Sequence, residues 1–293
     1  MAAAAAPAKP KMAFPSGEAL GVARAMRSGM ATGNQNDMGM FENMKGMALK
    51  MEERGEYDAA QELLEGILEY KPDNKEARFS LAKLLEKTGE LDNAANHYHK
   101  ILALDPNNVD AHYNLGVILY RQGDPHGARA EYTEALAYNP SHASSHFNLG
   151  VIQADLGNYA AAAQEYKAAV ASDPSHSDAH YNLGVVLQNT GDLDGSAEAY
   201  RVLLKLDPNH ADGHYNLGGL LREKGDMNGA IDSFQAAAEL DPRNSKYQLT
   251  YGSVKDQRKA PRPVKASPAV QKQPQDRFKT DYSRFDNIDT DSD

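Results

Sequence analysis

The pentapeptide His-Tyr-Asn-Leu-Gly occurs at residues 112–116, 180–184 and 214–218, and His-Phe-Asn-Leu-Gly occurs at 146–150. The copies lie 34 residues apart, or a multiple of 34. Prolines keep the same period, at Pro72, Pro106, Pro140, Pro174, Pro208 and Pro242. A fixed period of this length is typical of a repeat protein, in which each unit packs only against its neighbours. The pentapeptide therefore predicts a repeat array rather than a globular domain.

Placing each proline at the thirty-second position defines six repeats, which start at residues 41, 75, 109, 143, 177 and 211. The eighth and twentieth positions are small in every repeat, and the twenty-fourth is aromatic in all but the first. The fifteenth position is always glycine: Gly55, Gly89, Gly123, Gly157, Gly191 and Gly225. Glycine followed by a polar residue ends one helix and starts another, and the residue before proline avoids the helical region. Each repeat is therefore predicted to be two antiparallel helices.

This pattern of small residues, glycine, aromatic residue and proline resembles the tetratricopeptide repeat (TPR), a family that binds peptides and assembles complexes. The resemblance covers 41–244 and implies an all-α fold, an α-solenoid of six TPR helix pairs forming a right-handed superhelix. Residues 245–259 follow as a predicted C-terminal capping helix, because a solenoid needs a polar end. One departure from the family is histidine at the fourth position, where a bulky aromatic residue is usual.

Both ends of the chain are expected to be disordered. Residues 1–40 form a leader, 260–275 a flexible basic linker rich in proline, and 276–293 an acidic tail. The tail carries a short amphipathic motif with Phe278, Tyr282, Phe285 and Ile288 on one helical face. Three readings of the tail stay open: a recognition motif for a partner, a plain acidic tail, or a segment that occupies the protein's own groove.

Charge and composition narrow the function classes. The net charge is −10, and the acidic excess lies in the repeats, which argues against nucleic acid as a partner. No apolar run is long enough to predict a membrane span. The chain has no cysteine, which fits a reducing compartment. We expect a cytoplasmic protein; Arg24 and Arg27 in a leader with few acidic residues leave an organelle transit peptide as the alternative.

The candidate binding site is a row of asparagines at the sixth position of four repeats: Asn114, Asn148, Asn182 and Asn216. Asparagine is a poor residue inside a helix, and its amide can pair with both the N–H and the C=O of a peptide. At 100° per residue these side chains face away from the packed side, as do acidic residues at the second position. We therefore predict a concave groove that holds an extended peptide by its backbone. Its walls would carry Tyr113, Phe147, Tyr181 and Tyr215 beside the asparagines, and Asp110, Asp178 and Asp212. The alternative is that duplication copied the pentapeptide and that the amides have no role.

The asparagine row is similar to that of the repeat arm of O-linked N-acetylglucosamine transferases, which holds substrate polypeptides. Nothing after residue 260 is long enough for a nucleotide-sugar domain, and no nucleophile–base pair, phosphate loop or cofactor motif is present. We therefore expect no enzyme and no cofactor. The favoured function is a protein-interaction adaptor, serving as a co-chaperone for a heat-shock chaperone or as a complex-assembly factor. The alternative is a substrate-recognition module for a separate glycosyltransferase subunit.

Three histidine pairs have the spacing of a two-ligand metal site: His142 with His146, His176 with His180, and His210 with His214. The first member of each pair lies directly after the proline turn, and the second is expected on the packed face. Neither an acidic residue nor a third histidine completes a ligand set, whereas zinc requires at least three protein ligands. We therefore predict no metal.

Overall fold

The computed structural model describes residues 37–259. Within them the chain forms thirteen helices and no strand, so the predicted all-α solenoid is confirmed. The expectations for residues 1–36 and 260–293, which include most of the leader, the linker and the tail, lie outside the described part. The first described helix begins at Asp37, before residue 41, where the period placed the first repeat.

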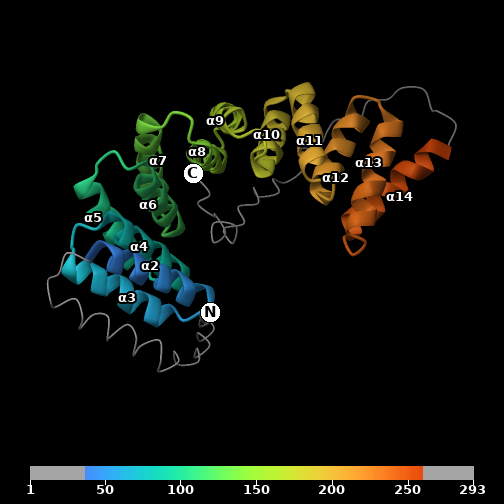
Figure 1. Cartoon of the computed structure of the whole chain (residues 1–293). Helices are drawn as coiled ribbons and strands as arrows, with labels where there is room; N and C mark the ends of the chain where they lie inside the picture. The colour runs from blue at the N-terminus through green and yellow to red at the C-terminus, as the bar shows by residue number, and fades with distance from the viewer. Residues whose placement is uncertain (1–36, 260–293) are drawn as a thin grey trace, which may run out of the picture. The chain divides into compact units, whose positions relative to one another are not determined.

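The helices follow one another with short turns between them (Figure 1). In chain order they are α2 (Asp37–Glu53), α3 (Tyr57–Tyr70), α4 (Lys75–Thr88), α5 (Leu91–Leu104), α6 (Val109–Arg121), α7 (Pro125–Tyr138), α8 (Ala143–Asp155), α9 (Tyr159–Ser172), α10 (Ser177–Thr190), α11 (Leu193–Leu206), α12 (Ala211–Glu223), α13 (Met227–Leu240) and α14 (Ser245–Lys259).

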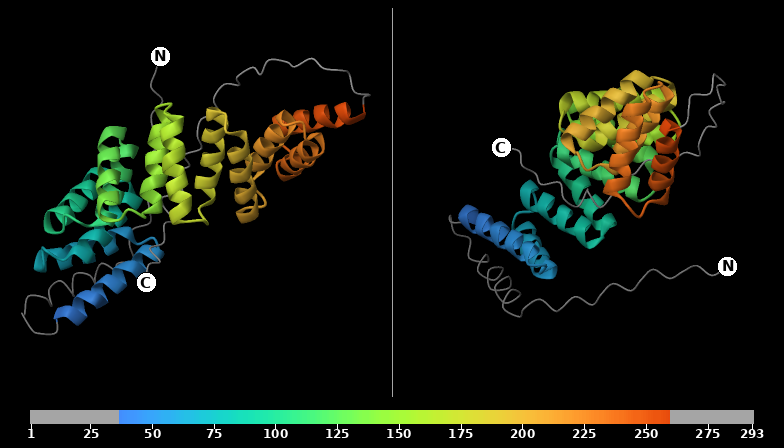
Figure 2. Two further views of the ribbon diagram at one scale, coloured as in Figure 1. Left: turned by 90° about the horizontal axis from the view of Figure 1, so that it is seen from above. Right: turned by 90° about the vertical axis from the view of Figure 1, so that its right-hand side faces the viewer.

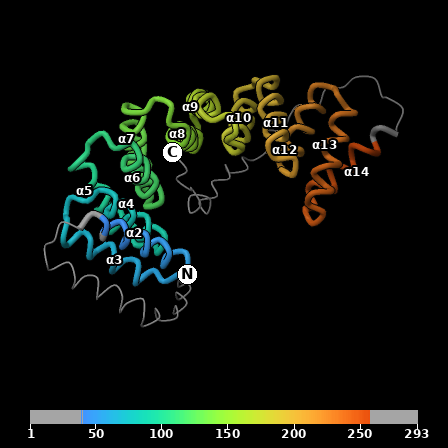
Figure 3. The backbone as a smooth tube through the Cα atoms, viewed as in Figure 1, coloured from blue at the N-terminus to red at the C-terminus, as the bar shows by residue number. Residues whose placement is uncertain are grey.

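The glycine at the fifteenth position makes the turn within each repeat, as predicted. All six of these glycines have a positive φ, between 76° and 88°, which residues with a side chain rarely adopt. The turn between repeats ends in a side chain that caps the next helix. Asn74 and Asn108 each accept a hydrogen bond from a backbone N–H of that helix, at 2.8 and 2.9 Å. Figure 3 follows these turns from helix to helix along the backbone.

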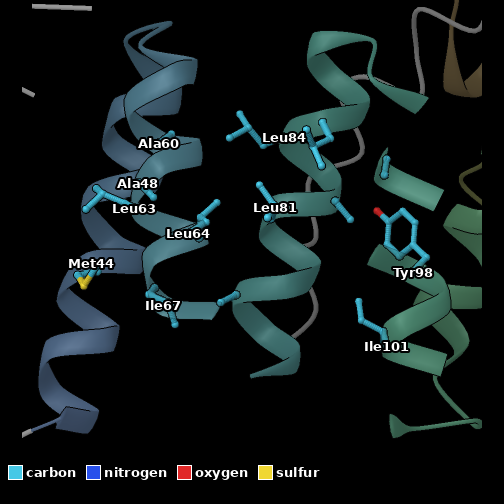
Figure 4. Packing of buried hydrophobic residues seen from close by; sticks show 14 of the residues in the cluster. Met44, Ala48, Ala60, Leu63, Leu64, Ile67, Leu81, Leu84, Tyr98 and Ile101 are labelled. Atoms are coloured by element: carbon cyan, nitrogen blue, oxygen red, sulfur yellow. The ribbon is translucent and has the colours of Figure 1, made fainter. Parts of the chain in front are cut away.

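The chain divides into two compact units, with the division inside α7 after Ala128. In the first unit, α2 packs on α3, α3 on α4, α4 on α5 and α5 on α6. Their shared core contains Met44 from α2, Leu63 from α3, Leu81 from α4 and Tyr98 from α5, all at most 1% exposed (Figure 4). Apolar side chains therefore fill the spaces between successive helices.

In the second unit every helix from α8 to α14 packs on the next, as the yellow-green to orange helices of Figure 2 show. A missing side chain allows this close packing. A Cβ on Gly150 would lie 2.6 Å from the ring of Tyr166, and one on Gly184 would lie 2.7 Å from the ring of Tyr200. The aromatic residue at position 24 thus lies directly on the glycine at position 8. α14 is the last described helix of the unit, and its Tyr247 is buried against the preceding helices.

Candidate functional site

The asparagine row of the second unit consists of Asn148 on α8, Asn182 on α10 and Asn216 on α12. Asn148 is 6% exposed and Asn182 is 1% exposed, whereas Asn216 is half-buried. Asn114, on α6 of the first unit, is 7% exposed. The expectation of four amides standing open on a groove wall is therefore corrected: three of the four side chains are buried. The physical reason is that helix periodicity predicts the side of the helix on which a side chain lies. It does not predict which atoms of the neighbouring repeat cover that side.

The side-chain amide of Asn216 contacts two tyrosine hydroxyls. Its Nδ2 lies 3.3 Å from the hydroxyl of Tyr200 on α11 and 3.5 Å from the hydroxyl of Tyr181 on α10. Both tyrosines belong to the preceding repeat. Burial raises the pKa of Tyr200 well above its ordinary value, so this hydroxyl stays neutral and available as an acceptor. The amide therefore joins two successive repeats.

Asn182 has the same position one repeat earlier, but it lacks one of these hydroxyl partners. Phe147 stands where the following repeat has Tyr181, so no hydroxyl is present beside Asn182 on that side. Oδ1 of Asn182 and Nδ2 of Asn148 are buried and have no hydrogen-bond partner. A buried polar atom without a partner costs about 1–3 kcal/mol. The α8–α10 part of the row therefore holds unused hydrogen-bonding capacity, both a donor and an acceptor.

Asn114 uses its amide differently. Its Nδ2 donates to the backbone oxygen of Asp110, 2.8 Å away in the preceding turn of α6. This bond is the local competition with the helix backbone that makes asparagine a poor helix residue. Asp110 itself is exposed at the start of α6. In the first unit the amide is thus satisfied within its own helix.

The aromatic residues beside the asparagines also pack between repeats. Phe147 lies 4.7 Å from the ring of His176, and Tyr181 lies 4.9 Å from the ring of His210, with interplanar angles of 30° and 31°. Tyr215 lies in the same way against Tyr247 of α14, at 5.1 Å. These three aromatic side chains are half-buried. Tyr113, the corresponding residue of the first unit, is 6% exposed. The three half-buried rings therefore pack between repeats and keep part of their surface exposed.

The predicted aspartates lie at the first turns of their helices, where a negative charge is favourable. Asp178 on α10 is half-buried. Asp212 on α12 accepts a hydrogen bond from the hydroxyl of Tyr247 and so helps to hold α14 in place. The pKa of Tyr247 is raised by burial and by this carboxylate. Asp212 is thus partly engaged by the capping helix.

The row is most open near its C-terminal end. Position 9 carries Val151 and Val185 in the two preceding repeats, but Gly219 on α12. A Cβ on Gly219 would meet no atom within 4 Å, in contrast to the tightly packed Gly218 beside it. A glycine inside a helix costs roughly 1 kcal/mol relative to alanine, and no close packing offsets that cost here. The half-buried Asn216 therefore borders open space.

The histidine pairs have structural roles that sequence reasoning missed. His176 and His210 cap α10 and α12: Nδ1 of each ring accepts a backbone N–H, at 3.3 and 3.0 Å. His180 and His214, the second members, each place Nε2 3.0 Å from the carbonyl oxygen of the turn proline. Asn74 and Asn108 cap the earlier helices, so alignment of position 34 would have revealed this role. No group of three or more metal-ligating side chains occurs between residues 37 and 259.

Comparison with known families places these repeats among TPR sequences. Family models described as tetratricopeptide repeat match residues 52–95, 113–177, 154–211 and 181–245, and a model described as TPR repeat matches 87–123. Together the matches extend from residue 52 to residue 245, more than half of the chain. No curated protein matches the sequence.

Several solved structures are similar to this chain. PilF of Pseudomonas aeruginosa is 20% identical with a TM-score of 0.63, covering 73% of this chain and 97% of that one. YrrB, described as a TPR protein with an unusual peptide-binding site, is 23% identical with a TM-score of 0.56, covering 64% and 97%. MamA is 26% identical with a TM-score of 0.51, covering 57% and 98%. Among residues 37–259, no helix has the length and apolar character needed to cross a bilayer.

Proposed function

Because the chain belongs to the tetratricopeptide repeat family, we propose that it is a non-catalytic adaptor that binds an extended segment of a partner protein. The binding surface is the asparagine row of the second unit, from Asn148 through Asn182 to Asn216. The observation that carries this proposal is the unused hydrogen-bonding capacity of that row. An extended peptide offers C=O and N–H groups in alternation, and these match the unpartnered Nδ2 of Asn148 and Oδ1 of Asn182.

The route to the buried amides begins at Asn216, which is half-buried and lies beside the open space at Gly219. A peptide that starts there and extends toward α8 reaches the other two amides if the rings of Tyr181 and Phe147 move aside. Rotation of a side chain on binding is common in interfaces whose backbone hardly moves. The segment is held mainly by its backbone, so the surface tolerates different partner sequences.

Charge indicates the kind of segment. Asp178 and Asp212 lie at the same side of their helices as the asparagines, and Asp155 is exposed at the end of α8. A row bordered by carboxylates favours a segment that is basic or mixed in charge, because complementary charge steers association. The peptide-binding site attributed to YrrB gives a precedent for such binding in a similar fold.

Two cellular settings fit this surface. In the favoured one the adaptor works in the cytoplasm with a heat-shock chaperone or a complex-assembly machine. In the second it selects substrates for a separate glycosyltransferase subunit; this alternative depends on the sequence resemblance of the asparagine row alone. The identity of the captured partner distinguishes the two.

Site-specific photo-cross-linking tests the proposal. A benzophenone amino acid in place of Gly219 is expected to capture a partner through an extended segment. The same group in place of Glu198, which is exposed on α11, serves as the control and is expected to capture nothing. The cross-linked segment is then made as a synthetic peptide, and its affinity is compared between the wild-type protein and variants.

The expected result is a loss of affinity of at least about tenfold for the double variant Asn182→Ala, Asn216→Ala, with helical content unchanged. The matched control Gln164→Ala, on the exposed side of α9, should leave the affinity unchanged. Unchanged affinity in a folded double variant contradicts the proposal. A chaperone among the captured proteins supports the first setting, and a glycosyltransferase supports the second.

A further inference from the structure

The first unit contains a separate hollow, between the turn that precedes α4 and the end of α5. Its volume is about 320 Å³, and its lining consists of Pro72, Asp73, Arg78, Lys100, Ala103 and Leu104. Pro72, Ala103 and Leu104 give it an apolar wall, and Leu104 is 49% exposed. Asp73, Arg78 and Lys100 supply the charged part of the lining, so apolar and charged groups meet in one hollow.

Arg78 contributes a charge without a partner of opposite sign. The side chain is 8% exposed, and one terminal nitrogen donates to the backbone oxygen of Pro72. Its Nε is buried and has no hydrogen-bond partner. Within residues 37–259 no carboxylate lies within ion-pair distance of Arg78 or of Lys100. A buried cation is costly unless it is paired, so this arrangement favours an anion.

Comparison between repeats shows that the second repeat lacks a carboxylate that the fourth repeat has. In the fourth repeat the fourth-position side chain, His146, lies 2.8 Å from a carboxylate oxygen of Glu165 at position 23. The second repeat has Arg78 at position 4 and His97 at position 23. The carboxylate of one repeat is thus replaced by an imidazole in the other, although the side chain that faces it is more strongly cationic.

His97 does not compensate for the charge of Arg78. Its Nδ1 is buried without a hydrogen-bond partner. Burial, and then the nearby charges of Arg78 and Lys100, lower the pKa of His97 to about 4. The ring is therefore neutral at pH 7, and the two cations beside it repel its proton. His97 therefore supplies no negative charge to Arg78 or Lys100.

We propose that this hollow binds a small monocarboxylate with a branched apolar group. The carboxylate pairs with Arg78 and Lys100, the two cations of the lining. The apolar group lies against Leu104, Ala103 and Pro72. Asp73, exposed at the rim, disfavours a second negative charge on the ligand. A free branched-chain acid and the C-terminal residue of a peptide share this chemistry. The site lies in the first unit, so it does not depend on the proposed peptide surface.

Nuclear magnetic resonance on the full chain tests the proposal with three probes: 4-methylpentanoate, N-acetyl-leucine and N-acetyl-leucinamide. The two carboxylates are expected to shift the methyl signals of Leu104 and the Nε–H signal of Arg78 saturably in the millimolar range. The amide, which has the same apolar group without the charge, should not. Binding of both carboxylates indicates a free acid as the ligand, and binding of N-acetyl-leucine alone indicates a peptide C-terminus.

Two variants then separate the site from unspecific binding. His97→Glu supplies the carboxylate internally, so it should raise the unfolding midpoint and weaken probe binding by at least about tenfold. Arg78→His introduces the residue that four later repeats carry at this position, and it should abolish binding. The control Arg121→His, at an exposed position of α6, should bind as the wild type does. The proposal is overturned if neither carboxylate shifts these signals, if the amide binds equally well, or if His97→Glu binds unchanged.

Discussion

Nδ2 of Asn216 donates a hydrogen bond to the hydroxyl of Tyr200 across 3.3 Å, and so links the first helix of one repeat to the second helix of the repeat before it. Tyr181 adds its hydroxyl to the same amide at 3.5 Å. The arrangement explains why an asparagine can persist inside a helix: its amide stabilises the boundary between repeats. It also shows what Phe147 lacks, since the corresponding ring beside Asn182 has no hydroxyl.

The change Phe147→Tyr should stabilise the protein by about 0.5–1.5 kcal/mol, because the new hydroxyl would lie beside the amide of Asn182, as the hydroxyl of Tyr181 lies beside Nδ2 of Asn216. Chemical denaturation monitored by circular dichroism measures the free energy of unfolding. The reverse change, Tyr181→Phe, should destabilise by a similar or smaller amount, because its bond to Asn216 is long. Equal stabilities for all three proteins would contradict this account of the amides.

Glycines at two neighbouring kinds of position should respond in opposite directions to alanine. In Gly150→Ala the new methyl group meets the ring of Tyr166 at 2.6 Å, so overpacking should cost about 1–3 kcal/mol. In Gly219→Ala the methyl group meets nothing, and the better helix propensity should stabilise by up to about 1 kcal/mol. Thermal unfolding of the two variants and the wild type measures the change in unfolding midpoint. We expect a decrease for Gly150→Ala and an increase for Gly219→Ala. Stabilisation by alanine at both positions would show that position 8 is not a packing constraint.

The cap of α10 should make stability depend on pH. Burial lowers the pKa of His176 below its ordinary value, and Nδ1 must be unprotonated to accept the N–H of Ala179. As the pH falls below about 6.5, His176 binds a proton in the unfolded chain but stays unprotonated in the folded chain. The free energy of unfolding therefore decreases. The contribution is fully present above that pH and is lost toward the lower pKa of the folded state.

Urea denaturation between neutral pH and pH 5 measures this slope. His176→Asn is the matched control, because Asn108 caps α6 in the same way and does not titrate. The variant should lose stability less steeply on acidification than the wild type does. His97, whose pKa is lowered to about 4, has the same sign and leaves a residual slope in both proteins. Identical slopes would exclude His176 as a contributor.

The capping helix α14 should loosen when Tyr247 loses its hydroxyl. The bond from this hydroxyl to the carboxylate of Asp212 is charge-assisted, and such bonds contribute roughly 1.5–3 kcal/mol. Tyr247→Phe is expected to speed amide hydrogen exchange in α14 more than in α10. Leu249, which is 74% exposed on the same helix, provides the control, and Leu249→Ala should leave exchange unchanged. Equal protection of α14 in Tyr247→Phe and wild type would show that packing alone holds the helix.

The sequence by itself determined the local part of this structure. Glycine at position 15 and proline at position 32 restrict the backbone of their own residues, so the helix ends could be predicted without knowledge of any contact. Small residues recur at positions 8 and 20 of every repeat, and small side chains at these points allow the two helices of a repeat to approach closely. Both conclusions need only the period and the properties of single residues.

The tertiary structure alone decided what the side chains of the row and of the histidine pairs do. Asn216 meets Tyr200, 16 residues away, and Tyr181, 35 residues away, and such contacts depend on the spacing between helices of different repeats. Helix periodicity places an amide on a side of its helix, but burial is set by the neighbouring repeat. For the same reason, Arg78 and His97 were two unremarked residues until packing placed them together without the carboxylate that faces His146.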